Sequence, residues 1–166
     1  MTLPPPDLSR FHAAQDQPRA GHADALLEIQ SGAKRSHWIW YVLPQLSGLG
    51  VSDMAQTYGL RGCAEAEAYL RDPVLRDRLF ALNNAIATHV LGPASMTLEA
   101  LMGSEIDASK VVSSLSLFER VSRSMTANER AGDIEAIGDI ATRILDAVAP
   151  HGYARCAITL AALEGD

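Results

Sequence analysis

The chain has 166 residues, of which 48% are apolar and 20% charged, and these are the proportions of one ordinary globular domain. Alanine and leucine prevail over the β-branched and aromatic residues that strands favour, so the composition indicates helix. The formal net charge of −6 repels the backbone of nucleic acids and excludes them as a default partner.

The first half of the chain is predicted to form several short helices. Residues 1–6, which include three prolines, are expected to be a flexible N-terminus, and Asp7 can cap the helix that follows. A second helix should run from about His22 to Ser31, with Gly32 as the residue just past its end. The other expected elements of this half are a loop over residues 47–50 and helices over residues 52–58 and 63–70.

The segment over residues 37–43 is apolar and aromatic, and its pattern leaves two structures open. Ser36 is a candidate N-cap for a helix, which Pro44 would end because proline cannot continue the hydrogen-bond ladder. The same mixture of Trp, Ile, Tyr and Val would also suit a buried strand. Periodicity cannot separate helix from strand over so few residues.

Asp72 and Pro73 give the clearest helix start, because a capping side chain is followed by proline at the first helical position. This helix should run to about Val90, before Gly92 and Pro93. Later helices are expected over about residues 97–102, 106–124, 134–148 and 154–163. Many short helices joined by Gly and Pro turns predict one all-α domain over residues 1–166, arranged as an irregular array or an α-α superhelix.

Residues 34–45 are chemically the most unusual part of the chain. They hold both tryptophans and one of only two lysines. Because arginine is the usual cation of this sequence, the lysine indicates a position that needs a compact ammonium in place of a planar guanidinium. On a helix, a cation, an imidazole and aromatic rings would share one wall that suits a flat or anionic ligand. The alternative is that the aromatic residues only pack the core. The candidate ligand-binding residues here are Lys34, Arg35, Ser36, His37, Trp38, Trp40 and Gln45.

A second polar cluster follows the start of the helix expected over residues 106–124. Spacings of three and four place Asp107, Lys110 and Ser114 on one stripe, with Ser113 beside Lys110. A lysine flanked by hydroxyl groups can seat an anion, and a desolvated lysine can act as a base. The alternative is an ordinary i, i+3 salt bridge with the hydroxyl groups turned to solvent.

The sequence predicts neither a metal site nor a cofactor. Its histidines lie in separate segments, and the single Gly48-Leu49-Gly50 pattern reads as a turn. Two cysteines, Cys63 and Cys156, are too few for a disulfide framework and favour a reducing cytoplasm. The start lacks a secretory signal and no apolar run approaches the roughly 20 residues that span a bilayer, so we expect a cytoplasmic protein without a membrane segment.

The two clusters together resemble the bacterial domain of unknown function 1810 family, some members of which carry a calpastatin label. The resemblance covers most of the chain to about Phe118. It implies an all-α fold of the superhelix kind and a stand-alone cytoplasmic protein, and it implies no activity. It is carried by Phe11, Ala14, Gln15, Gly32–Lys34, Ser36–Trp38, Trp40, Pro44, Gln45, Leu49, Gly50, Tyr58, Glu65, Ala66, Tyr69, Leu70, Pro73, Leu75, Arg78, Leu79, Asp107, Lys110, Ser113, Ser114, Leu117 and Phe118.

Three functions remain open from the sequence. The first is a small helical binding module in which both clusters converge on one mixed aromatic and basic pocket for a small anionic or planar ligand. The second is an enzyme acting on a small anionic metabolite, with Lys110 or His37 as general base. Ser36 cannot serve as a nucleophile paired with His37, because neighbours on a helix point about a quarter-turn apart. The third is a scaffold that binds a protein partner through a helical groove.

Overall fold

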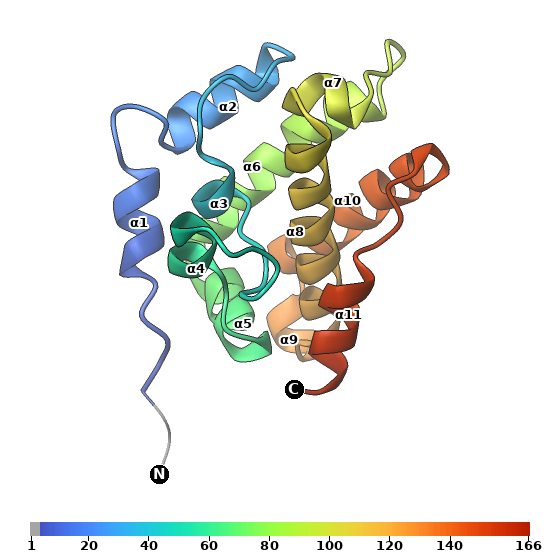
Figure 1. Ribbon diagram of the computed structural model, residues 1–166. Helices are drawn as coiled ribbons and strands as arrows, with labels where there is room; N and C mark the ends of the chain where they lie inside the picture. The colour runs from blue at the N-terminus through green and yellow to red at the C-terminus, as the bar shows by residue number, and fades with distance from the viewer. Residues whose placement is uncertain (1–3) are drawn as a thin grey trace.

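Helix predominates throughout residues 4–166, which are the part of the chain that the computed structural model describes (Figure 1). Within that part there is no strand, only an isolated bridge between Leu46 and Leu60, so the all-α prediction is confirmed. The helices are α1 (Ser9–Gln15), α2 (His22–Gln30), α3 (Ile39–Val42), α4 (Asp53–Tyr58), α5 (Cys63–Arg71), α6 (Pro73–Val90), α7 (Leu98–Met102), α8 (Glu105–Ser124), α9 (Ala127–Arg130), α10 (Asp133–Val148), the 3-10 helix η1 (Ala149–His151) and α11 (Ala157–Glu164).

The predicted N-terminal segment, residues 1–6, lies partly outside the described residues, which begin at Pro4. Residues 4–6 are exposed and without regular secondary structure. None of the described helices is both long and apolar enough to cross a membrane. Among residues 4–166, no three His, Cys, Asp or Glu side chains gather in a way that could hold a metal ion.

Local sequence signals fix the start of α6 and the end of α2. The Asp72 carboxylate accepts hydrogen bonds from the backbone N–H groups of Val74 and Leu75, both at 3.0 Å, and Pro73 occupies the first helical position. After α2, Gly32 adopts a left-handed φ of +85°, and the N–H groups of Gly32 and Ala33 donate back to the last turn. Both boundaries agree with the sequence prediction.

The segment over residues 37–43 is helical, but only for the single turn of α3. Trp38 occupies the N-cap position, and the prediction that Ser36 caps this helix is wrong. The reason is that Ser36 is taken by another partner, the Glu28 carboxylate on α2, which accepts from both its N–H and its hydroxyl group. A tertiary contact has replaced the expected local one.

Two further differences concern the second half of the chain. The helix α9 was not expected, although a capping box between Thr126 and Glu129 marks its start. The last helix begins at Ala157 rather than Ala154. The remaining long helices, α8 and α10, lie close to their predicted positions, and α8 gains one residue because Ser104 caps it.

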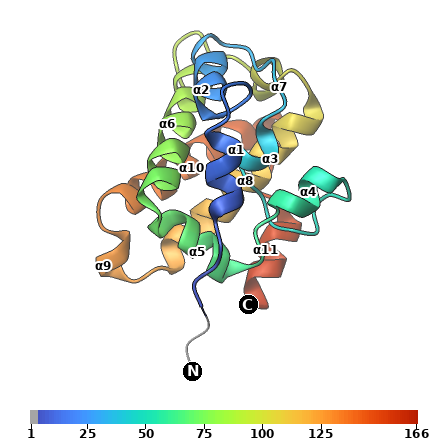
Figure 2. The ribbon, with the colours of Figure 1, turned by 90° about the vertical axis from the view of Figure 1, so that its left-hand side faces the viewer.

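The core forms around α8, which packs against α10, α5, α7 and α11 (Figure 1). The inward face of α10 is buried as its spacing predicts, from Ile134 to Val148. Gly138 allows α10 to approach α8, because a Cβ at this position would collide with the buried Ser122 hydroxyl. Figure 2 shows α3 and α4 on the same side of the molecule as α8 and α11, and this side carries the candidate site.

Candidate functional site

The two polar clusters of the sequence meet at Asp107, in the first turn of α8. The Lys34 ammonium lies 2.9 Å from Asp107 Oδ2, and the Lys110 ammonium lies 3.6 Å from Asp107 Oδ1. The Lys34 side chain is only 5% exposed and also donates to the Ser36 carbonyl at 2.7 Å. One carboxylate therefore joins the segment before α3 to α8.

Each lysine also lies against one tryptophan ring. The Lys34 ammonium is 5.2 Å from the centre of the Trp38 ring, and the Lys110 ammonium is 4.7 Å from that of Trp40. Trp38 is fully buried, whereas Trp40 is partly exposed. The Lys34 pair thus belongs to the interior, and the Lys110 pair belongs to the surface.

Glu28 holds this segment in place, and the sequence reading missed it. Its carboxylate accepts from the N–H groups of Arg35 and Ser36, from the Ser36 hydroxyl, and from the Trp38 indole at 2.8 Å. Burial alone would raise the pKa of Glu28, but the hydrogen bonds from Ser36, Arg35 and Trp38 lower it to about 2. No local pattern marks this role, because Glu28 sits in α2, outside the segment that it binds.

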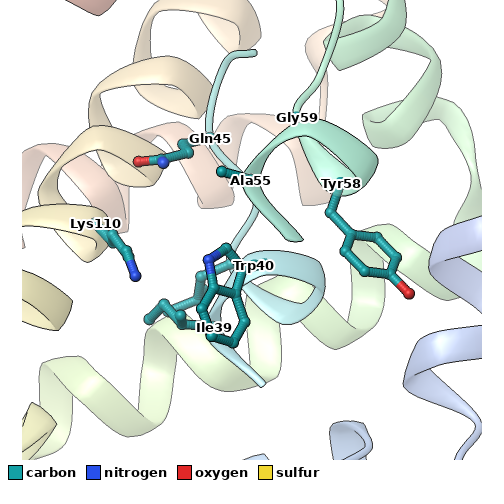
Figure 3. Close-up of a pocket in the computed structure, with 8 residues that line it drawn as sticks. Ile39, Trp40, Gln45, Ala55, Tyr58, Gly59 and Lys110 are labelled. Atoms are coloured by element: carbon teal, nitrogen blue, oxygen red, sulfur yellow. The ribbon is translucent and has the colours of Figure 1, made fainter. Parts of the chain in front are cut away.

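An open groove of about 630 Å³ runs beside the Lys110 and Trp40 pair, between the α3–α4 region and α8 with α11. Next to it lies a much smaller pocket of about 10 Å³, room for about one water molecule (Figure 3). In Figure 3 the Lys110 side chain points toward Trp40, with Gln45 nearby. The groove is lined by Trp40, Gln45, Leu49, Gly50, Val51, Ser52, Ala55, Glu105, Ile106, Ser109, Lys110, Ser113, Cys156 and Ile158.

The predicted site residues divide into three groups. Trp40, Gln45, Lys110 and Ser113 line the groove, and Ser113 also donates to the Ser109 carbonyl at 3.1 Å. Lys34, Ser36, Trp38 and Asp107 lie behind this wall and fix it. Arg35 and His37 are exposed outside the groove lining, and Ser114 is buried in the core.

This grouping separates the two candidate general bases, Lys110 and His37. The structure brings Lys110 to the groove and does not bring His37 there. Several groove residues were also missed, notably Ile106, Cys156 and Ile158. Ile106 precedes the cluster that drew attention, and the other two come from the C-terminal region, so only the fold brings them to this face.

Comparisons with known proteins agree with this architecture. The model of the family described as "Protein of unknown function (DUF1810)" matches residues 5–135. The crystal structure of the conserved hypothetical protein Rv1873 from Mycobacterium tuberculosis is similar, with 31% sequence identity and a TM-score of 0.71 over 95% of this chain and 96% of that chain. No curated protein matches the chain. The family match includes Lys110 and ends before Cys156.

Proposed function

The chain belongs to the DUF1810 family, whose description names no activity, and from its groove we propose a helical module that binds a small anionic ligand with a planar or apolar body. The supporting observation is the position of the Lys110 ammonium. Asp107 carries one negative charge between two lysines, and its closer partner is Lys34. About one positive charge is left over, and it lies at Lys110 over the Trp40 ring, on the groove side.

The walls of the groove suit such a ligand. Trp40 offers a ring face, Leu49, Val51 and Ile106 offer apolar surface, and the Gln45 amide offers a hydrogen-bond donor. A volume of about 630 Å³ falls in the range of roughly 300–1,000 Å³ for small-molecule sites. Glu105 is the one carboxylate among the lining residues.

Calorimetric titration with phenyl phosphate and benzoate tests this function, with benzylamine as a cation of similar shape. We expect the two anions to bind more tightly than the amine. The Lys110→Gln variant should bind them about tenfold or more weakly, because a hydrogen bond to a charged group is worth about 1.5–3 kcal/mol. Glu105→Gln removes the opposing charge and should strengthen anion binding.

Arg35→Gln provides the matched control, since Arg35 is an exposed cation outside the groove lining. It removes the same charge as Lys110→Gln and should leave affinity unchanged. Equal weakening in both variants would mean that only the overall charge matters. Tighter binding of benzylamine than of both anions would contradict the proposal.

A protein partner is the second candidate, and one observation favours it. Val51, Ile106 and Ile158 line the groove, yet they are 92%, 70% and 69% exposed. An amphipathic helix with acidic residues beside its apolar face would cover these side chains and pair with Lys110. A labelled helical peptide with Leu and Glu on one face should then bind more tightly than the same peptide with Lys in place of Glu.

We further propose that residues 1–166 form one domain of a bacterial cytoplasmic protein. The Mycobacterium tuberculosis relative supports the bacterial origin, and two unpaired cysteines within residues 4–166 support the compartment. The predicted lack of a nucleic-acid partner rests on the net charge of −6.

A further inference from the structure

Cys156 occupies a position at the groove that differs from that of the other cysteine. It is the residue at the N-cap of α11, and its backbone N–H donates to the Ser116 hydroxyl of α8 at 3.0 Å. This bond and the ion pairs of the preceding residue, Arg155, with Glu119 fix the start of α11 against α8. Cys156 therefore lines the groove from a rigid position.

Polar groups lie close to the Cys156 thiol. Burial raises its pKa, but the neighbouring Ser113 and Thr159 hydroxyl groups and the backbone N–H groups of Ile158 and Thr159 lower it below the usual range. Cys63 shows the opposite. Burial raises the pKa of Cys63, and the nearby Glu67 and Asp166 carboxylates raise it further. Both thiols are partly buried, so access alone does not separate them.

The Thr159 hydroxyl gives an independent sign that a negative charge belongs here. Thr159 is fully buried, and its Oγ1 has no hydrogen-bond partner among residues 4–166. A buried hydroxyl without a partner is costly, and a neutral thiol is only a weak acceptor. A thiolate at Cys156 would accept a hydrogen bond from the Thr159 hydroxyl and remove that cost.

We propose that Cys156 is a site of thiol–disulfide exchange with a small anionic disulfide that enters the groove. The Cys156 thiol loses its proton to solvent, and the resulting thiolate attacks one sulfur of the disulfide, so that a new S–S bond forms to Cys156 and the old S–S bond breaks. The departing half leaves as a thiolate that carries the bonding electron pair, so no other oxidant is needed. The exchange depends on Cys156 alone, whereas the preference for an anion rests on the proposed function of Lys110.

Few charged groups face this sulfur. Lys110 and Glu105 of α8 line the groove with it, and Arg155 is engaged by Glu119 and Asp146. The Lys110 ammonium favours both the thiolate and an incoming anion. The exchange rate should therefore follow the ionisation of Cys156 and respond to substitution of Lys110.

Two single-cysteine variants test the exchange with dithiobis(nitrobenzoate), an anionic aromatic disulfide. Cys63→Ser leaves Cys156, and Cys156→Ser leaves Cys63. At neutral pH we expect Cys156 to react at least about tenfold faster than Cys63. The pH midpoint of its reaction rate should also be lower than that of Cys63. Equal or slower reaction of Cys156 would overturn the proposal.

Substitutions around the sulfur test whether its polar neighbours set the reactivity of Cys156 or whether exposure of the thiol alone accounts for it. In the Cys63→Ser background, Thr159→Val keeps the side-chain shape and removes the donor, so the pH midpoint of the reaction should rise. Ser113→Ala should raise it as well, and Ser109→Ala is the control that should not. Circular dichroism verifies folding of each variant, and an unchanged midpoint in folded Thr159→Val would contradict the role of the donors.

Cystamine, a cationic disulfide, tests the charge preference. Lys110→Gln should slow the anionic reagent severalfold and leave or raise the rate with cystamine. If both reagents respond equally while Cys156 stays faster than Cys63, the anionic preference and the proposed function fail but the exchange site stands. If Cys156 is slow although anions bind as expected, the exchange site alone fails.

Discussion

At the scale of single residues, Glu28 is the side chain on which the site depends most. Its carboxylate holds Arg35, Ser36 and Trp38, and so fixes the stretch that places Lys34 against Asp107. The sequence pointed to Lys34, Asp107 and Lys110 because their residue types and spacing are unusual. It could not point to Glu28, because an ordinary glutamate in an amphipathic helix has no local mark of a distant partner.

The lowered pKa of Glu28 predicts how stability should depend on pH. A carboxylate with a folded pKa of about 2 and an ordinary unfolded value of 4.5 stabilises the fold above about pH 4.5, and the stabilisation is lost as the pH falls toward 2. The full shift corresponds to about 3 kcal/mol, which solvent screening of this partly exposed group reduces to about 1 kcal/mol.

Urea unfolding at neutral pH and near pH 3 measures this effect. Glu28→Gln should be less stable than the wild type at neutral pH and should lose less stability on acidification. Glu164→Gln, at the exposed end of α11, is the matched control and should follow the wild type. Parallel pH profiles for Glu28→Gln and the wild type would contradict the assignment.

At the scale of elements, the contact between α8 and α10 depends on Gly138. Alanine in a helix interior is usually favoured over glycine by up to about 1 kcal/mol. Here its Cβ would displace the Ser122 hydroxyl, which donates to the Glu119 carbonyl at 3.0 Å inside the core. We therefore expect Gly138→Ala to destabilise the protein by about 1–3 kcal/mol, as overpacking does.

The paired variant makes this prediction specific. Ser122→Ala removes the colliding oxygen, so adding Gly138→Ala to it should cost much less or become stabilising. Thermal unfolding of the two single variants and the double variant gives the coupling. Additive effects would show that the helices do not approach through these two residues.

Elements whose signals are local could be predicted, and those that depend on distant partners could not. Asp72 with Pro73 marked the start of α6, and Gly32 marked the end of α2, because each boundary is decided within a few residues. The short α3 was ambiguous because so few residues show no clear periodicity, and its cap was predicted wrongly because Ser36 is bound by Glu28 of α2. The start of α11 was placed too early, since Cys156 is held there by Ser116 of α8.

At the scale of the whole molecule, α8 connects everything that has been assigned to the groove. Its first half carries Asp107, Lys110 and Ser113, and its second half carries Glu119, which binds Arg155 with two hydrogen bonds of 2.7 and 2.8 Å. The sequence predicted that α8 and residues 34–45 contribute to one site. It did not predict the contribution of α11, because no residue pattern shows which helix covers which.

The unequal settings of the two tryptophans give the protein a built-in optical probe. Trp38 is fully buried next to the Lys34 ammonium, whereas Trp40 is partly exposed beside the Lys110 ammonium. Iodide should therefore quench the emission of Trp40 efficiently, and caesium should quench it poorly, while Trp38 resists both ions. In Trp40→Phe the quenchable emission should disappear, and equal quenching by the two ions in the wild type would contradict the charge at the groove.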